Sequence, residues 1–312
     1  MTTIPAPGPH GGDGPRVAAA LGLGPDQVLD LSANLNPFAP DVAALAAPHV
    51  GSLQRYPDVE AAEALLTEAV GVPGERLVLT AGGSQAIALV GDHLRRGWVD
   101  EPDFSLYRRH LARVEAGAPR WRSDPHNPTG RLAAGGDERV AVWDEAFLPL
   151  SAATWTRGRP GWGLGSLTKA FACPGLRLGF AVAPNERAAA AIRRRRPAWA
   201  VGSLGCALLP ELLACADLVG WTARIAAARS ELTQVLGAHA LVPLPSDAPW
   251  VLAAAAPEGL RVALARQAVV VRDCRSFGLP DQVRIAVPDG AGLERLDAAL
   301  ARVRGVSDHD RP

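Results

Sequence analysis

Lysine is almost absent from this chain of 312 residues. Lysine and arginine together number 32, and Lys169 is the only lysine among them. Acidic residues also number 32, so the formal net charge is zero. Nonspecific binding to nucleic acid needs a surplus of cations on one face, and a neutral chain is therefore a poor candidate for it. A bias toward arginine explains why lysine is scarce, but it does not decide where the last lysine stays.

Further absences narrow the class of protein. No apolar run approaches the ~20 residues of a membrane-spanning helix. The first residues lack the basic start and the apolar core of a secretory signal. The four cysteines, Cys173, Cys206, Cys215 and Cys274, include no closely spaced pair. We therefore expect a cytoplasmic globular protein with reduced, mostly buried thiols.

Common nucleotide-binding and metal-binding motifs are also missing. The sequence holds no P-loop, no H-E-x-x-H, and no G-x-G-x-x-G at a turn from strand to helix. The seven histidines lie far apart in the sequence. We expect no metal site.

Hydrophobic patterning predicts an α/β fold. Apolar segments predict strands over residues 76–80, 140–143 and 178–183, with helices over 58–70, 185–195 and 203–236. Strands that alternate with helices are typical of a largely parallel sheet. Past about residue 240, short strands and helices predict a smaller α+β domain. We expect three parts: an N-terminal arm with part of the small domain (1–48), a large domain (49–238) and a C-terminal small domain (239–312).

Four polar clusters follow predicted strands or occupy turns, which is where α/β sheets bind ligands. They lie at residues 81–85, 126–130, 144–145, and 166–169 together with Arg177. Taken alone, each has an ordinary structural explanation: a glycine turn, a loop, a helix cap and a pair of surface cations.

The chemistry of the four clusters is complementary. A lysine beside apolar residues loses solvation, which lowers its pKa and frees the Lys169 amine to form a Schiff base. A helix N-terminus after the glycine turn can bind an anion, and Ser166 and Arg177 can meet the same phosphate. Asn127 on a rigid turn can donate to a phenolate oxygen, and Asp144 can keep a pyridine nitrogen protonated.

Together the strings HNPTG, DEAF and SLTKAFACPGLRLGF resemble the fold-type I pyridoxal-phosphate aminotransferase superfamily, class I and II. Order and spacing agree over roughly residues 30 to 290. The resemblance implies pyridoxal 5'-phosphate as cofactor. It also implies a large cofactor-binding domain with a mostly parallel central sheet and a smaller α+β domain.

The resemblance implies a role for each matching position. Lys169 would form the Schiff base with the cofactor, Asp144 would pair with its pyridine nitrogen, and Asn127 would contact its phenolic oxygen. The cofactor phosphate would be held by Ser84, Gln85, Ser166 and Arg177. Phe104 would stack on the ring, and Tyr56 would reach the cofactor of the neighbouring subunit in a homodimer.

Shorter segments resemble one branch of the superfamily. Residues 32–37 (SANLNP) and 55–58 (RYPD) are similar to histidinol-phosphate aminotransferases, and residues 10–13 (HGGD) to threonine-phosphate decarboxylases of the cobalamin pathway. The resemblance implies a phosphorylated amino acid as substrate. Arg284 would clamp its α-carboxylate, and Arg272, His10 and Asn34 are the further candidates for substrate binding.

Two departures from the family pattern stand out. Phe147 occupies a position where many relatives carry a tyrosine that contacts the phenolic oxygen, and its loss should shift the pKa of the Schiff base. The segment from Phe104 to Asn127 is shorter than in relatives by about one strand and one helix. This shortening puts an outer part of the large sheet in question.

Three functions remain open at this point. The HGGD segment favours decarboxylation of threonine phosphate, and transamination of the histidinol-phosphate type is the alternative. The third is a cofactor-binding relative that has lost catalysis and serves in regulation or interaction. Retention of Lys169, Asp144 and Arg177 together argues against the third.

Overall fold

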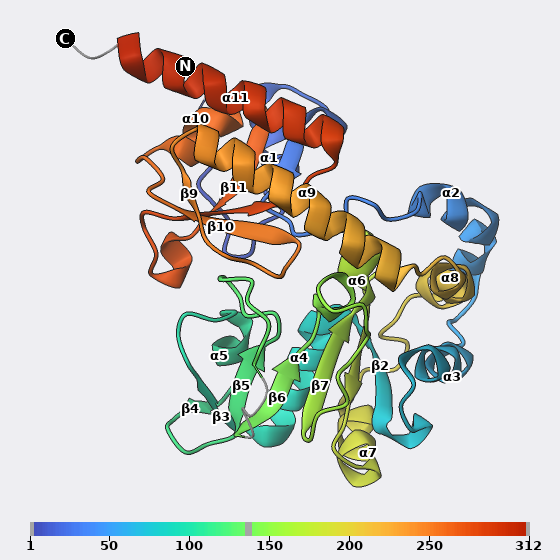
Figure 1. The fold of residues 1–312 in the computed structure, drawn as a ribbon. Coiled ribbons are helices and arrows are strands. Elements are labelled where there is room, and N and C mark those ends of the chain that lie inside the picture. Colours follow the sequence, from blue (N-terminus) through green and yellow to red (C-terminus); the bar gives the residue numbers. More distant parts are fainter. Residues whose placement is uncertain (1–2, 135–138, 310–312) are drawn as a thin grey trace. The chain divides into compact units, whose positions relative to one another are not determined.

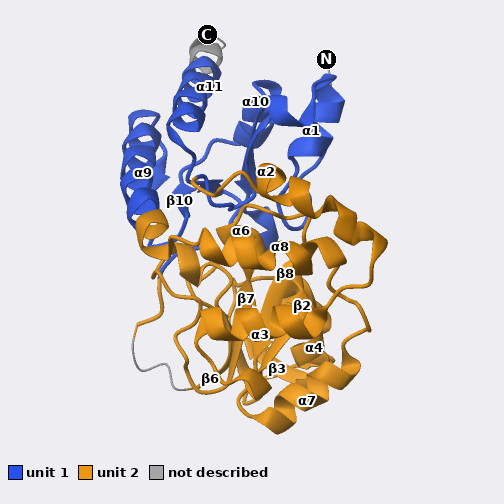
Figure 2. Ribbon diagram, turned by 90° about the vertical axis from the view of Figure 1, so that its right-hand side faces the viewer, with its two compact units in different colours: residues 1–37, 128–131, 223–312 blue, residues 38–127, 132–222 orange. Residues whose placement is uncertain are grey.

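The computed structural model describes residues 3–134 and 139–309, with side chains described as far as residue 304 (Figure 1). The chain forms two compact units (Figure 2). Unit 1 comprises residues 1–37, 128–131 and 223–312, and unit 2 comprises residues 38–127 and 132–222. The chain changes unit at 37/38 and 222/223, whereas the domain boundaries predicted from the sequence lie at 48/49 and 238/239.

Unit 2 consists of a sheet with helices around it. Its strands are β2 (Leu77–Ala81), β3 (Arg96–Val99), β4 (Arg113–Val114), β5 (Arg120–Ser123), β6 (Val140–Asp144), β7 (Trp162–Ser166) and β8 (Leu178–Val182). Its helices are α2 (Val42–Ala46), α3 (Val59–Val70), α4 (Gly82–Leu94), α5 (Leu106–His110), α6 (Leu167–Ala170), α7 (Glu186–Arg195) and α8 (Ser203–Ala214).

Within the described ranges, seven strands form the sheet of unit 2 in the order β2-β8-β7-β6-β5-β3-β4. The pairs from β7 through β6, β5 and β3 to β4 are parallel, whereas β8 runs antiparallel to both of its neighbours. The expected α/β fold with a mostly parallel large sheet is therefore confirmed. The short segment between Phe104 and Asn127 still supplies α5, β4 and β5, and the outer edge shrinks to the two residues of β4.

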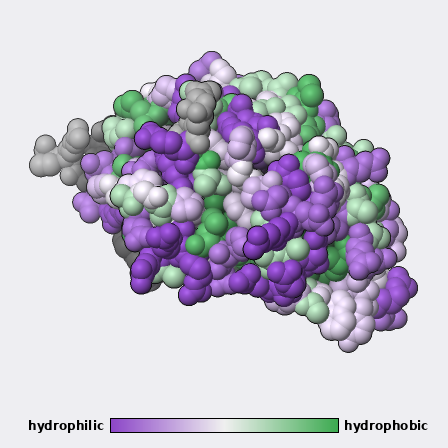
Figure 3. Space-filling view, turned by 90° about the horizontal axis from the view of Figure 1, so that it is seen from below, coloured by the Kyte–Doolittle hydropathy of each residue, from purple (hydrophilic) through white to green (hydrophobic). Residues whose placement is uncertain are grey.

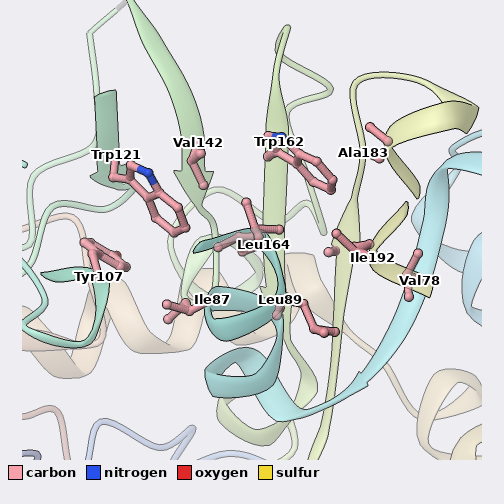
Figure 4. Close-up of a cluster of buried hydrophobic side chains, with 14 of the residues drawn as sticks. Val78, Ile87, Leu89, Tyr107, Trp121, Val142, Trp162, Leu164, Ala183 and Ile192 are labelled. Carbon is pink, nitrogen blue, oxygen red and sulfur yellow. The ribbon is translucent and has the colours of Figure 1, made fainter. Parts of the chain in front are cut away.

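The core of unit 2 lies between its sheet and α4, which packs against β2, β7 and β8. Figure 4 shows Val78, Val142 and Leu164 gathered with Ile87 and other apolar side chains. These four side chains are 0–2% exposed, and each contributes roughly 1.5–3 kcal/mol of hydrophobic free energy to folding. The strand ends are thereby held in fixed positions.

Charged side chains cover the open edge of β2. The Glu63 carboxylate accepts the Leu79 N–H at 2.9 Å. Arg193 and Arg196 pair with Glu63 at 2.9 Å and donate to the carbonyls of Leu77 and Leu79 at 2.7 Å. The backbone groups that an edge strand would leave open are thus satisfied within the chain. Hydrophilic side chains also predominate on the face drawn in Figure 3, where hydrophobic ones form small separate patches.

Unit 1 is built on a second sheet. Its strands are β1 (Leu29–Leu31), β9 (Val242–Pro243), β10 (Trp250–Ala254), β11 (Val269–Asp273) and β12 (Val283–Ala286), in the order β1-β11-β12-β10-β9. Its helices are α1 (Gly14–Leu21), α10 (Leu260–Arg266) and α11 (Gly290–His309). β1 pairs with β11 in parallel and the other pairs are antiparallel, so an N-terminal strand completes a C-terminal sheet.

One helix predicted over residues 203–236 is wrong. The segment forms α8 and then α9 (Leu218–Ala238), which meet at an angle of 80°. Asp217 restarts the helix, because its carboxylate accepts the Gly220 N–H at 2.8 Å and its carbonyl accepts the Trp221 N–H at 2.8 Å. Among the described helices, none alone has the length and hydropathy of a membrane span; α8 and α9 reach them only when joined across this bend.

All four cysteines are free thiols. Cys173, Cys206 and Cys274 are buried and Cys215 is exposed, in agreement with the expectation of reduced, mostly buried thiols. Burial raises the pKa of each of the three buried thiols to about 11.

Candidate active site

Three predicted site residues follow neighbouring parallel strands of unit 2. Asp144 ends β6, Lys169 lies on α6 directly after β7, and Asn127 follows β5 by four residues. The carboxyl ends of parallel strands meet at one edge of a sheet, so these residues share that edge. Lys169 lies close enough to Asp144 for its charge to lower the pKa of that carboxyl, and its Nζ lies 5.6 Å from the centre of the Phe147 ring.

Asp144 is held by two donors. The Tyr107 hydroxyl donates to Oδ2 at 2.8 Å, and the Ala146 N–H donates to Oδ1 at 3.1 Å. Burial raises the pKa of Asp144, and the hydrogen bond from Tyr107, that from Ala146 and the charge of Lys169 act in the opposite direction. Asp144 therefore closes a turn instead of capping a helix, and it stays available as an acceptor for a protonated ring nitrogen.

Glycines let Arg177 and Ser166 approach the first turn of α4. Gly82 has a φ of +76°, and a Cβ there would lie 2.6 Å from Nη2 of Arg177. A Cβ on Gly83 would lie 3.5 Å from the Cβ of Ser166, and one on Gly179 would lie 2.5 Å from the carbonyl carbon of Gly82. A guanidinium, a hydroxyl and the N–H groups of a helix N-terminus thus lie close together, an arrangement that suits an anion.

The turn into α4 is fixed by its own side chains. The Gln85 amide oxygen accepts the Ala81 N–H at 2.8 Å, and the Thr80 hydroxyl donates to the Gly82 carbonyl at 3.0 Å. Helix α4 consequently begins at Gly82, inside the glycine turn. The Ser84 side chain is exposed at this turn, while the contact described for Gln85 holds the turn together.

Asn127 and Phe104 each contact a neighbouring side chain of unit 2, and Tyr56 lies on the surface. The N–H of Asn127, which is buried, donates to the Ser123 hydroxyl at 2.8 Å. The Phe104 ring meets the Tyr107 ring edge to face, with 5.7 Å between centroids. Tyr56, in contrast, is 77% exposed and stacks on Trp199 at 4.5 Å.

Unit 1 holds a pair of buried arginines. Arg272 on β11 and Arg284 on β12 are directly opposed in the antiparallel register, and they are 2% and 6% exposed. The Phe277 ring lies 5.8 Å from one guanidinium carbon and 5.9 Å from the other. The pKa of Arg284 is lowered to about 10, chiefly by burial; the charge of Arg272 acts in the same direction and Cys274 in the opposite one. Like charges that are opposed and buried are unfavourable unless an anion compensates them.

The N-terminal arm packs against Arg272. This side chain donates to the carbonyls of Gly8 and Pro9, which brings the segment carrying His10 beside it. Asn34 is 3% exposed, and neither its Nδ2 nor its Oδ1 has a hydrogen-bond partner in the described part of the chain. Buried amides are normally satisfied, so Asn34 is suited to a polar ligand.

Tyr107, Asp103 and Ser123 were not expected from the sequence. All three are buried and connect to site residues through hydrogen bonds. The sequence offered one weak signal, since Tyr107 is one of two tyrosines in the chain.

The chain matches the family model of aminotransferase class I and II over residues 146–303. It is 30% identical to threonine-phosphate decarboxylase of Salmonella typhimurium, over 96% of this chain and 98% of that protein. It is also 30% identical to histidinol-phosphate aminotransferase of Halobacterium salinarum, over 92% and 94%.

Two solved structures share the fold. Histidinol-phosphate aminotransferase from Sinorhizobium meliloti, in complex with pyridoxal-5'-phosphate, aligns with a TM-score of 0.80 at 18% identity, over 94% of this chain and 95% of that one. L-Threonine-O-3-phosphate decarboxylase from Porphyromonas gingivalis aligns with a TM-score of 0.73 at 18% identity, over 89% and 100%.

Proposed function

This chain belongs to the class I and II aminotransferase family, and from that premise we propose that it is a pyridoxal-phosphate enzyme that decarboxylates threonine phosphate. Cobalamin biosynthesis is the pathway that this activity would serve. The observation that carries the choice of substrate is the opposed, buried pair Arg272 and Arg284.

The residues of unit 2 fit pyridoxal phosphate. The φ of +76° at Gly82 favours glycine, and the Arg177 guanidinium and Ser166 lie against this turn, where together they suit a phosphate. Lys169 supplies the amine, and arginine cannot replace it because a guanidinium remains protonated. This explains why a chain that uses arginine everywhere else keeps lysine at this position.

The cofactor supplies an aldehyde that condenses with amines and a protonated ring that withdraws electrons from bonds at the substrate Cα. Asp144 holds the proton on the ring nitrogen, and Tyr107 fixes the orientation of its carboxylate. Asn127 donates to the phenolic oxygen, and Phe104 covers the ring. The Lys169 amine would take up or return a proton at the substrate Cα.

A substrate with two anionic groups accounts for the arginines of unit 1. Arg284 binds the α-carboxylate, and Arg272 with His10 and Asn34 binds the phosphate. A dianionic substrate neutralises both guanidinium groups, whose burial and mutual repulsion are otherwise unfavourable. Arg272 donates to the carbonyls of Gly8 and Pro9, directly before the HGGD segment that resembles decarboxylases, and this proximity supports decarboxylation.

Transamination of the histidinol-phosphate type is the second candidate, supported by the Halobacterium salinarum relative. The two activities separate when the enzyme is incubated with threonine phosphate and no oxo acid. Sustained release of CO2 supports decarboxylation. One turnover that stops, and restarts only with 2-oxoglutarate, contradicts it and supports the aminotransferase.

We include a cytoplasmic homodimer in the proposal. The support is the exposed stack of Tyr56 on Trp199 together with Val50 and Leu53, which are 52% and 62% exposed. A second copy that covers these side chains would bring Tyr56 to the neighbouring cofactor. Sedimentation velocity tests this, since a monomer at micromolar concentration contradicts it.

A further inference from the structure

Asp103 is a buried carboxyl that has no role in the proposed reaction. It follows β3 by four residues and is 3% exposed. Its Oδ1 accepts the Phe104 N–H at 2.7 Å and the Ser123 hydroxyl at 2.6 Å, and its Oδ2 accepts the Ser123 N–H at 3.1 Å. The Asp103 carboxyl therefore fixes the backbone at Phe104 and at Ser123.

Ser123 passes this restraint on to Asn127. Its hydroxyl donates to Asp103 and accepts the Asn127 N–H at 2.8 Å. Tyr107, which donates to Asp144, lies close enough to Asp103 for the charge of that carboxyl to raise the pKa of its hydroxyl.

The surroundings of Asp103 disfavour its ionised form. The pKa of Asp103 is raised to about 7, chiefly by burial and also by the charge of Asp144, while hydrogen bonds from Ser123 and Phe104 act in the opposite direction. The other titratable groups facing it are Tyr107 on α5 and Glu101, whose carboxylate accepts the Asp103 N–H at 3.3 Å. An apolar residue at this position would avoid the cost, and perturbed carboxyls gather at functional sites.

We propose that Asp103 is a positioning residue of the cofactor site: it fixes Phe104 directly and Asn127 through Ser123, and in its ionised form it adds a second negative charge near Asp144. The inference rests on the proposed function. It assigns the stacking residue and the phenol-oxygen donor a common anchor, so the loss of that anchor affects both contacts together.

The test is a pH titration of the absorbance of the pyridoxal-phosphate-loaded protein, with the cofactor dissociation constant measured in parallel. A negative charge favours protonated forms of the bound cofactor, so Asp103→Asn should lower the midpoint by about 0.5–1 pH unit. Ser123→Ala keeps the charge and removes the link to Asn127. It should weaken cofactor binding about 3–10-fold with a smaller midpoint shift.

Glu145→Gln is the matched control. Glu145 is 2% exposed and accepts the Thr156 hydroxyl at 2.5 Å and the Arg157 N–H at 3.2 Å, with none of these partners at the cofactor. It should lower stability without moving the midpoint. The proposal is overturned if Asp103→Asn and Ser123→Ala both behave as wild type, or if Glu145→Gln shifts the midpoint equally.

The experiment still decides between the proposals if a variant does not fold or if the wild type does not bind the cofactor. If Asp103→Asn does not fold, Ser123→Ala carries the test alone, because it leaves the acceptors of Asp103 in place for the Phe104 N–H. A wild-type chain that gives no cofactor band contradicts the proposed function, and this inference with it. A wild-type band with unaltered variants contradicts the inference alone.

Discussion

Replacing Asp103 by asparagine should remove a contribution to stability that varies with pH in the wild type. The native pKa of Asp103 is about 7, against an ordinary value of 3.8. Between these values the native carboxyl binds a proton that the unfolded chain releases. Stability from this group is therefore fully present below pH 3.8 and is lost as the pH rises through 7.

The expected magnitude follows from the same shift. Each pH unit between the two pKa values costs about 1.4 kcal/mol. From pH 5 to pH 8 the wild type should lose roughly 2.5 kcal/mol more than Asp103→Asn, which has no titrating group at this position. The Ser123 N–H loses its acceptor in the variant, since an amide nitrogen donates, but that offset does not vary with pH.

Urea denaturation of the cofactor-free protein, followed by tryptophan fluorescence at pH 5, 6, 7 and 8, measures this difference. Contributions of titrating groups that do not interact with Asp103 cancel between the two proteins. Two stability curves that run parallel from pH 5 to pH 8 would refute the reasoning. So would a wild-type protein that gains stability relative to the variant as the pH rises.

Three other substitutions give direct tests. Glu63→Ala removes the partner of two arginines and the acceptor at the β2 edge, and should lower the free energy of unfolding by about 3 kcal/mol in urea titrations, whereas exposed Glu75→Ala should change little. Phe147→Tyr adds a hydroxyl where many relatives carry one, and should lower the pH midpoint of cofactor absorbance by about one unit; an unchanged midpoint contradicts the placement of its ring. Arg272→Met should raise the KM for threonine phosphate by about 30-fold or more, and should affect threonine itself far less. Equal effects on both substrates would contradict its role at the phosphate.

Most of the fold could be predicted because its signals are local. Asp58 accepts the Ala61 N–H at the start of α3, and Gly71 ends that helix at a φ of +71°. Capping residues within the local sequence therefore define both ends of the helix. The β strands of unit 2 are short apolar runs with turn residues at their ends. The sequence does not predict the break between α8 and α9, because the residues on both sides of Asp217 are mostly apolar and continue the helical pattern.

The site divides in the same way. Lys169, Asp144 and Arg177 stand in motifs whose chemistry is visible in the residue types. Asp103 and Tyr107 could not be predicted, since their importance comes from hydrogen bonds to residues far along the chain: Ser123, 20 residues on, and Asp144, 37 residues on. Only the fold brings such partners together.

The most direct test of the account is the identity of the residue that binds the cofactor. The pyridoxal-phosphate-loaded protein is reduced with borohydride, digested and examined by mass spectrometry. We expect one modified side chain, Lys169, and no reduced adduct in Lys169→Ala. Intact Lys169 in the reduced protein, or a label at the N-terminal amine alone, would contradict it.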